Sequence, residues 1–189
     1  MNRIFIALCF SIFVSAANAQ SADAQAWAVD NAKSKIEFTG KQLGSSFTGS
    51  FSAYSIDIAF DPENLAGSHI IATIDLASAR TGSREIDDGL PTSDWFDVKK
   101  HPKAVFRSQT ISAKADGSYE AAGALSLRGV EKPLTLPFTV TLDGSKAVAD
   151  ATTTLVRTDY GVGQGDFESD EYVAFDVGVK IHIEAARKP

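Results

Sequence analysis

The chain is poor in sulfur and in positive charge. Its 189 residues include one cysteine, Cys9, and one methionine, Met1. Because Cys9 lies in an N-terminal apolar stretch, the rest of the chain has no thiol for a disulfide, a nucleophile or a thiolate metal site. Its 18 Lys and Arg against 24 Asp and Glu give a formal net charge of −6. Such a balance excludes electrostatic attraction for nucleic acid, so we expect no nucleic-acid partner.

The chain also lacks an apolar run long enough for a membrane span of about 20 residues. Its most apolar stretch, residues 4–14, follows the positive Arg3 and precedes Ala17-Asn18-Ala19, a small-residue cleavage pattern. We therefore predict that residues 1–19 are a cleaved export signal and that residues 20–25 form a flexible leader. The expected location is the periplasm, in soluble form.

Apolar and polar residues alternate through most of the remaining chain. Residues 172–184 show this best, with apolar residues at every second position from Val173 to Ile183. Since successive side chains of a strand point to opposite faces, this segment has one apolar and one polar face. Similar alternation occurs in segments 35–39, 47–60, 68–77, 103–113, 119–127, 134–142 and 147–157. About eight strands are predicted, the number at which a closed antiparallel barrel fills its interior or holds one small ligand.

Three segments depart from this all-β pattern. Residues 47–60 change phase between Phe51 and Tyr54, which predicts a β-bulge or a bend. Pro137 interrupts a strand and predicts an edge, a bulge or a kink, because proline has no N–H to donate. Residues 82–97 are rich in acids and contain Leu90-Pro91, and we expect a short helical crossing over one end of the barrel there.

No motif in the chain predicts catalysis or a metal site. His69, His101 and His182 are far apart and lack metal-ligand spacing. The glycines of residues 161–165 are spaced unlike a nucleotide-binding loop, and a strand follows them, so a rim loop is expected.

Acidic residues form further candidates. The acids of residues 166–171 are solvated or hold a cation. Asp87-Asp88 and the pair Asp94 and Asp97 either cap short helices or act as general acids and bases. The prediction is a protein that is not an enzyme and holds neither a metal nor a resident cofactor.

The residues that face inward on the predicted strands define a candidate ligand-binding interior. The residues predicted to line it are Phe38, Phe47, Phe51, Phe106, Leu125, Leu136, Phe138, Val177 and Ile181. Small residues on the same phases, Gly49, Gly123, Ala149 and Ala151, are expected to leave room. At the barrel mouth, Arg84, Arg128 and Arg157 either contact acids and carbonyls or grip a polar ligand head.

Several local patterns, in this order, resemble the YceI family of periplasmic, lipocalin-like, polyisoprenoid-binding proteins. They are Phe47-Thr48-Gly49-Ser50-Phe51, the segments 81–90 and 93–97 followed by His101-Pro102-Lys103-Ala104-Val105-Phe106, the segment 123–133 (GALSLRGVEKP), and Arg157-Thr158-Asp159-Tyr160-Gly161-Val162-Gly163. The resemblance covers about residues 26–186. One departure is the crossing, where family members often carry Arg-Asp-x-His-Leu and residues 84–90 have no histidine.

The resemblance implies an extended barrel that carries a polyisoprenoid lipid, either an isoprenoid quinone or a prenyl phosphate. Residues 162–167 are similar to the branch associated with b-type membrane cytochromes, which implies transient contact with such a partner. The oligomeric state stays open, with a homodimer among the alternatives. Two other hypotheses also stay open: an enzyme of unknown reaction using acids and Arg84 at the mouth, and a structural barrel with a packed interior.

Overall fold

The computed structural model describes residues 24–189. The predicted export signal and residues 20–23 of the predicted leader lie outside these described residues. Eleven strands occur: β1 Ala26–Val29, β2 Lys35–Gln42, β3 Ser45–Phe51, β4 Tyr54–Ala59, β5 His69–Asp75, β6 Ala79–Arg80, β7 Lys103–Ala113, β8 Tyr119–Leu127, β9 Val130–Asp143, β10 Lys146–Val156 and β11 Asp176–Arg187. Helix α1 spans Arg84–Gly89, and short 3-10 turns span Leu65–Gly67, Leu76–Ser78, Arg157–Tyr160 and Gly165–Phe167.

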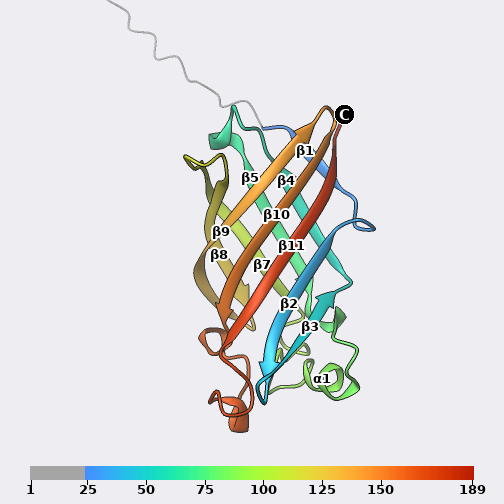
Figure 1. Ribbon diagram of the computed structural model, residues 1–189, viewed down its shortest axis with the longest axis vertical. Coiled ribbons are helices and arrows are strands. Elements are labelled where there is room, and N and C mark those ends of the chain that lie inside the picture. The colour runs from blue at the N-terminus through green and yellow to red at the C-terminus, as the bar shows by residue number, and fades with distance from the viewer. Residues whose placement is uncertain (1–23) are drawn as a thin grey trace, which may run out of the picture.

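The strands close into an antiparallel barrel. Their order is β1-β4-β5-β7-β8-β9-β10-β11, and pairing of β1 with β11 completes the ring. Strands β1 and β2 both pair with β11, one after the other along its length, so they share one position in the barrel. Strand β4 pairs with β1 and β3 pairs with β2, so these two strands share the next position. The predicted all-β barrel of about eight strand positions is therefore confirmed, and Figure 1 shows its long, tilted walls.

The phase change between Phe51 and Tyr54 is a break between two strands. Strand β3 pairs with β2, whereas β4 pairs with β1 and β5. At the break, the Ala53 N–H donates to the Ser78 hydroxyl at 3.1 Å, so a side chain replaces the sheet ladder. The predicted bend is present here, while the bulge lies elsewhere, between Ser108 and Thr110 of β7.

Strands β9 and β10 separate halfway along their hairpin. They pair from Asp143 and Lys146 as far as Phe138 and Ala151, and Pro137 is the next residue of β9. Strand β9 remains paired with β8 from Pro137 back to Val130. The edge predicted from Pro137 is therefore confirmed, since β9 loses its second neighbour where it loses an N–H.

The two ends of the barrel differ in construction (Figure 1). At the upper end lie the C-terminus and the hairpin turns that follow β7 and β9. At the lower end lie α1, the β2–β3 turn and the long segment between β10 and β11. The predicted helical crossing is thus found at the lower end, with α1 at its start.

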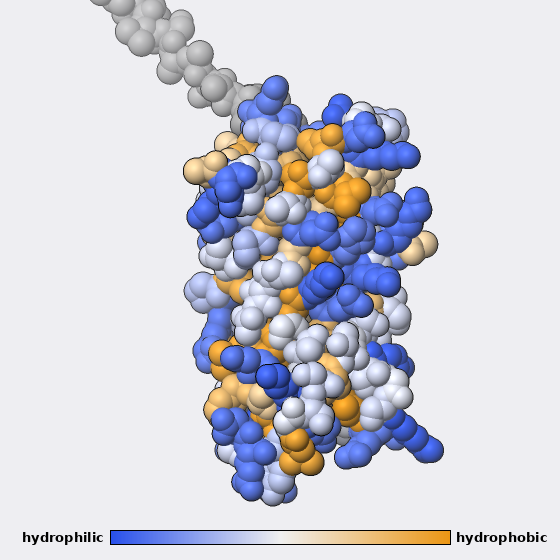
Figure 2. Space-filling model, viewed as in Figure 1, coloured by the Kyte–Doolittle hydropathy of each residue, from blue (hydrophilic) through white to orange (hydrophobic). Residues whose placement is uncertain are grey.

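The interior contains the buried apolar side chains, and the outer wall is mostly polar. Near the upper end, the Phe60 ring lies 5.1 Å from the Tyr119 ring and 5.8 Å from the Phe138 ring. The Trp27 indole donates to the Phe60 carbonyl at 2.9 Å, which fixes β1 across this cluster. On the outside, Figure 2 shows hydrophilic residues with small apolar spots between them, as expected for strands with one solvated face.

Candidate functional site

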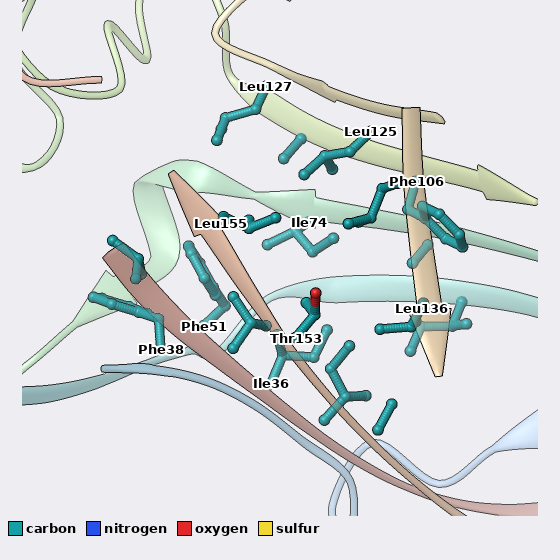
Figure 3. A pocket seen from close by; sticks show the side chains of 18 of the residues that line it. Ile36, Phe38, Phe51, Ile74, Phe106, Leu125, Leu127, Leu136, Thr153 and Leu155 are labelled. Atoms are coloured by element: carbon teal, nitrogen blue, oxygen red, sulfur yellow. The ribbon is translucent and has the colours of Figure 1, made fainter. Parts of the chain in front are cut away.

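An apolar cavity of about 260 Å³ occupies the barrel interior. Every strand position contributes to its wall, from Trp27 of β1 to Ile183 of β11. Figure 3 shows aromatic and branched aliphatic side chains converging on it from opposite walls, including Phe51, Phe106 and Leu136. Because strand side chains alternate, the same pattern that predicted the strands also produces this cavity.

The structure places all nine predicted interior residues against the cavity: Phe38, Phe47, Phe51, Phe106, Leu125, Leu136, Phe138, Val177 and Ile181. It also adds Trp27, whose strand the alternation pattern did not reveal because β1 has four residues. Their contact with a ligand stays a prediction.

The predicted small residues fall into two groups. Ala149 and Ala151 line the cavity, as expected. The space above Gly49 is instead filled by the Phe38 ring, which would clash with a Cβ at that position. At Gly123 a Cβ would clash with the Arg107 carbonyl oxygen, so this glycine permits close backbone approach at the β7 bulge. The expectation that Gly49 and Gly123 leave room for a ligand is therefore wrong.

Polar groups in the cavity wall are few. The Thr153 hydroxyl oxygen lies among carbon atoms of neighbouring side chains in Figure 3 and has no hydrogen-bond partner in the described part of the chain. Tyr160 is also buried in the wall, and burial followed by the nearby Asp159 charge raises the pKa of its phenol. The wall therefore suits an apolar ligand.

Arg157 is a buried structural cation at the lower end. Only 3% of its surface is exposed, and its guanidinium lies 5.7 Å from the Trp95 ring. It donates to the carbonyls of Val162 at 2.9 Å, Ser169 at 2.8 Å, Val173 at 2.8 Å and Ala174 at 3.1 Å. Burial lowers its pKa, and the charge of Asp170 opposes that effect. Arg157 therefore holds the segment between β10 and β11 in place through carbonyl contacts.

The other two arginines also have protein partners. Arg84 lies on the surface of α1 and pairs with Asp88 at 3.5 Å. Arg128 donates to the Ser93 carbonyl at 2.6 Å from a two-residue hairpin turn, where its φ is +52° and that of Gly129 is +78°. These two positive angles are those of the turn that joins strongly twisted strands. The structure thus keeps Arg84, Arg128 and Arg157 apart, each in a separate local contact.

A second cavity of about 250 Å³, here called the outer chamber, lies at the lower end. The residues that line it are Gln42, Phe47, Glu85, Ile86, Gly89, Leu90, Thr92, Asp94, Trp95, Phe167 and Val173. Phe47, Leu90, Trp95 and Val173 also line the inner cavity, so these four side chains separate the two spaces. The sequence analysis did not identify Gln42, Leu90 and Trp95 as site residues. For Trp95 a signal was available, since it is a large aromatic residue in an otherwise polar crossing.

The remaining candidate acids have local roles. Asp87 accepts hydrogen bonds from the Thr81 N–H and hydroxyl, which hold the pKa of Asp87 below its usual range. Asp97 is buried and pairs with Lys100 at 3.0 Å. Among residues 24–189, no three His, Asp or Glu side chains are grouped so that they could hold a metal ion.

The histidines and the glycine-rich loop likewise have structural surroundings. His182 pairs with Asp150 at 2.8 Å and His69 lies 3.5 Å from Asp57, both on the outer wall. The His101 ring packs against Gly129, so that a Cβ added at this glycine would lie 2.6 Å from the ring. Residues 161–165 pass over the lower rim as predicted, and their Gly163 N–H donates to the Asp94 carbonyl.

The closed barrel and its apolar cavity place the chain in the class of lipocalin-like β-barrel proteins. A model of the YceI-like domain matches residues 27–185, and the chain belongs to this family. A UPF0312 protein of Vibrio parahaemolyticus is 30% identical over 179 residues, which cover 90% of each chain.

Solved structures show the same fold. The crystal structure of Burkholderia cenocepacia BcnA matches with a TM-score of 0.80 and 34% identity, covering 84% of this chain and 100% of BcnA. A polyisoprenoid-binding domain from Saccharophagus degradans matches with a TM-score of 0.65 and 14% identity, over 87% and 99% of the two chains. In residues 24–189, no helix is both long enough and apolar enough to cross a membrane.

Proposed function

We propose that the protein is a periplasmic carrier that holds a polyisoprenoid lipid in the barrel interior. The observation that carries this proposal is the continuous apolar wall of the 260 Å³ cavity. A cavity of about 150 Å³ binds benzene, so this space accommodates about ten carbon atoms. At about 0.8 kcal/mol per buried CH₂, burial of that length contributes several kcal/mol to affinity.

Two further observations support the proposal. One structural neighbour is described as a polyisoprenoid-binding domain, and its shared fold makes the same ligand class a reasonable choice here. The export pattern of residues 1–19 supports a periplasmic location. Contact with a b-type membrane cytochrome and formation of a homodimer stay predictions from the sequence.

The alternatives find less support. A packed structural barrel would have no cavity of this size. The enzyme hypothesis required Arg84 and acids to act together, but Arg84 is exposed and pairs with Asp88, while Asp87 bonds to Thr81. We therefore favour binding over catalysis.

The test is recovery of the lipid from protein exported to a bacterial periplasm. Organic extraction and mass spectrometry should yield an isoprenoid in near-stoichiometric amount. Ala151→Trp, which fills the cavity, should abolish recovery, whereas Thr152→Trp on the exposed face of the same strand should retain it. A lipid-free native protein, or equal recovery from both variants, would contradict the proposal.

A further inference from the structure

The outer chamber contains polar side chains that are not used by the protein. In the described part of the chain, the Gln42 amide and the Glu85 carboxylate make no hydrogen bond or ion pair. The Asp94 carboxylate accepts one hydrogen bond, at 3.3 Å, from its neighbour Ser93. Gln42 is half-buried in the chamber wall, but its amide atoms are not buried, so they can bond to water or to a ligand. These groups are available to a ligand.

The chamber wall carries negative charge. Glu85 and Asp94 line it, and none of the lining side chains is a lysine, arginine or histidine. The nearby cations Arg157 and Arg128 do not line the chamber: Arg157 donates to backbone carbonyls, and Arg128 donates to the Ser93 carbonyl. A phosphate in this chamber would meet two exposed carboxylates and no lysine or arginine in the lining, so charge repulsion that salt can screen would disfavour it.

The chamber is also placed where the head of a tail-bound lipid would lie. It shares Phe47, Leu90, Trp95 and Val173 with the inner cavity, so the two spaces lie side by side with these side chains between them. The inner cavity accommodates about ten carbons, so a longer isoprenoid must extend beyond it. The Trp95 and Phe167 rings, whose centroids are 5.0 Å apart, provide apolar surface for that emerging end.

From these observations we propose that the outer chamber is the head-group site and selects an uncharged, oxygen-bearing head group over a phosphate. This inference rests on the proposed function. It assigns the Gln42 amide to donate to a ligand oxygen, and the Glu85 and Asp94 carboxylates to accept from a ligand hydroxyl. An isoprenoid alcohol and a quinone or quinol share this chemistry, whereas a prenyl phosphate or diphosphate does not.

The experiment compares two probes with the same tail, geranylgeraniol and geranylgeranyl monophosphate, on lipid-stripped protein. Affinity is followed through quenching of tryptophan fluorescence, since Trp95 lines the chamber. We expect the alcohol to bind at least about tenfold more tightly at low ionic strength, and the ratio to shrink as salt screens the carboxylates.

Variants then locate the selection. Glu85→Gln combined with Asp94→Asn should reduce the preference for the alcohol several-fold by strengthening phosphate binding. Asp166→Asn removes an acid of the same end that does not line the chamber and should leave the ratio unchanged. Gln42→Leu should weaken binding of a quinone probe, decylubiquinone, more than binding of a saturated hydrocarbon of equal length.

Different outcomes separate this inference from the function on which it rests. Equal or tighter binding of the phosphate, or a ratio unaffected by the double substitution, would overturn the head-group assignment while carrier function stands. A loss of alcohol affinity in Thr153→Val with no effect of the chamber variants would place the head in the inner cavity and also overturn it. Failure of every probe to bind would overturn both proposals.

Discussion

The upper and lower ends of the barrel are built from different kinds of structure. The upper end is closed by short hairpin turns and by the Phe60, Tyr119 and Phe138 rings. The lower end is closed by non-strand segments, and one cation, Arg157, holds four of their carbonyls. The difference indicates that ring packing stabilises the upper end, whereas hydrogen bonds from Arg157 stabilise the lower end.

Removal of an upper-end ring should have the largest effect on stability. Phe138→Ala should lower the free energy of unfolding by about 3–5 kcal/mol, because it deletes a buried ring from a three-ring cluster. Phe47→Ala at the lower end should cost about 1–2 kcal/mol, since Phe47 is half-buried between two cavities. Urea denaturation measures both, and equal losses would contradict the proposed division of roles.

Arg157→Ala should cost about 3 kcal/mol, because buried carbonyls lose a charged donor. The damage should be local, so limited proteolysis should cut within residues 161–175 before the strands unfold. Arg157→Lys should restore part of the loss at most, because an ammonium cannot reproduce the planar fork. An uncut segment in Arg157→Ala would show that other contacts hold the lower end.

High pH should lower the free energy of unfolding by a smaller amount. Burial raises the pKa of Tyr160 and of Tyr54 above the usual value near 10. The unfolded chain therefore releases these protons first, and stability falls as pH rises from about 10 through the folded-state pKa values. Tyr160→Phe should flatten the decline in unfolding free energy measured between about pH 8 and 11.5. An unchanged decline would assign it to other groups.

The smallest expected effect is a gain at the β2–β3 turn. Leu43 is 72% exposed and has a φ of +49°, a conformation that asparagine tolerates better than leucine. Leu43→Asn should therefore raise the free energy of unfolding by about 0.5 kcal/mol, measurable as a small shift in Tm. A loss of stability would indicate that the exposed leucine side chain makes a contact of its own.

The walls of the barrel were predictable from the sequence because they depend on alternation. Strands β7 and β8 have the predicted bounds, and all nine predicted interior residues face the cavity. Period-two patterns are local, and each inward residue contacts the same enclosed space wherever its partner strand lies. Strand β1 was missed because four residues are too few to display a period.

The lower end was harder to predict because its contacts join distant segments. Nothing in the spacing of Gln42, Leu90, Trp95 and Phe167 shows that they surround one chamber. The roles of the arginines depended on which carbonyls came within reach, and for Arg157 these lie 5 to 17 residues away along the chain. Gly49 and Gly123 were expected to leave space in the interior, but the Phe38 ring fills the space at Gly49 and the Arg107 backbone fills it at Gly123.

The size of the inner cavity has a thermodynamic consequence. A barrel with a cavity of about 260 Å³ makes fewer dispersion contacts between its own side chains than a fully packed barrel. Any molecule that enters restores those contacts in the native state alone, and at one hundred times its Kd it adds about 2.7 kcal/mol to stability. A lipid bound as proposed would thus complete the core, and the melting temperature would rise with the fraction of the protein that carries it.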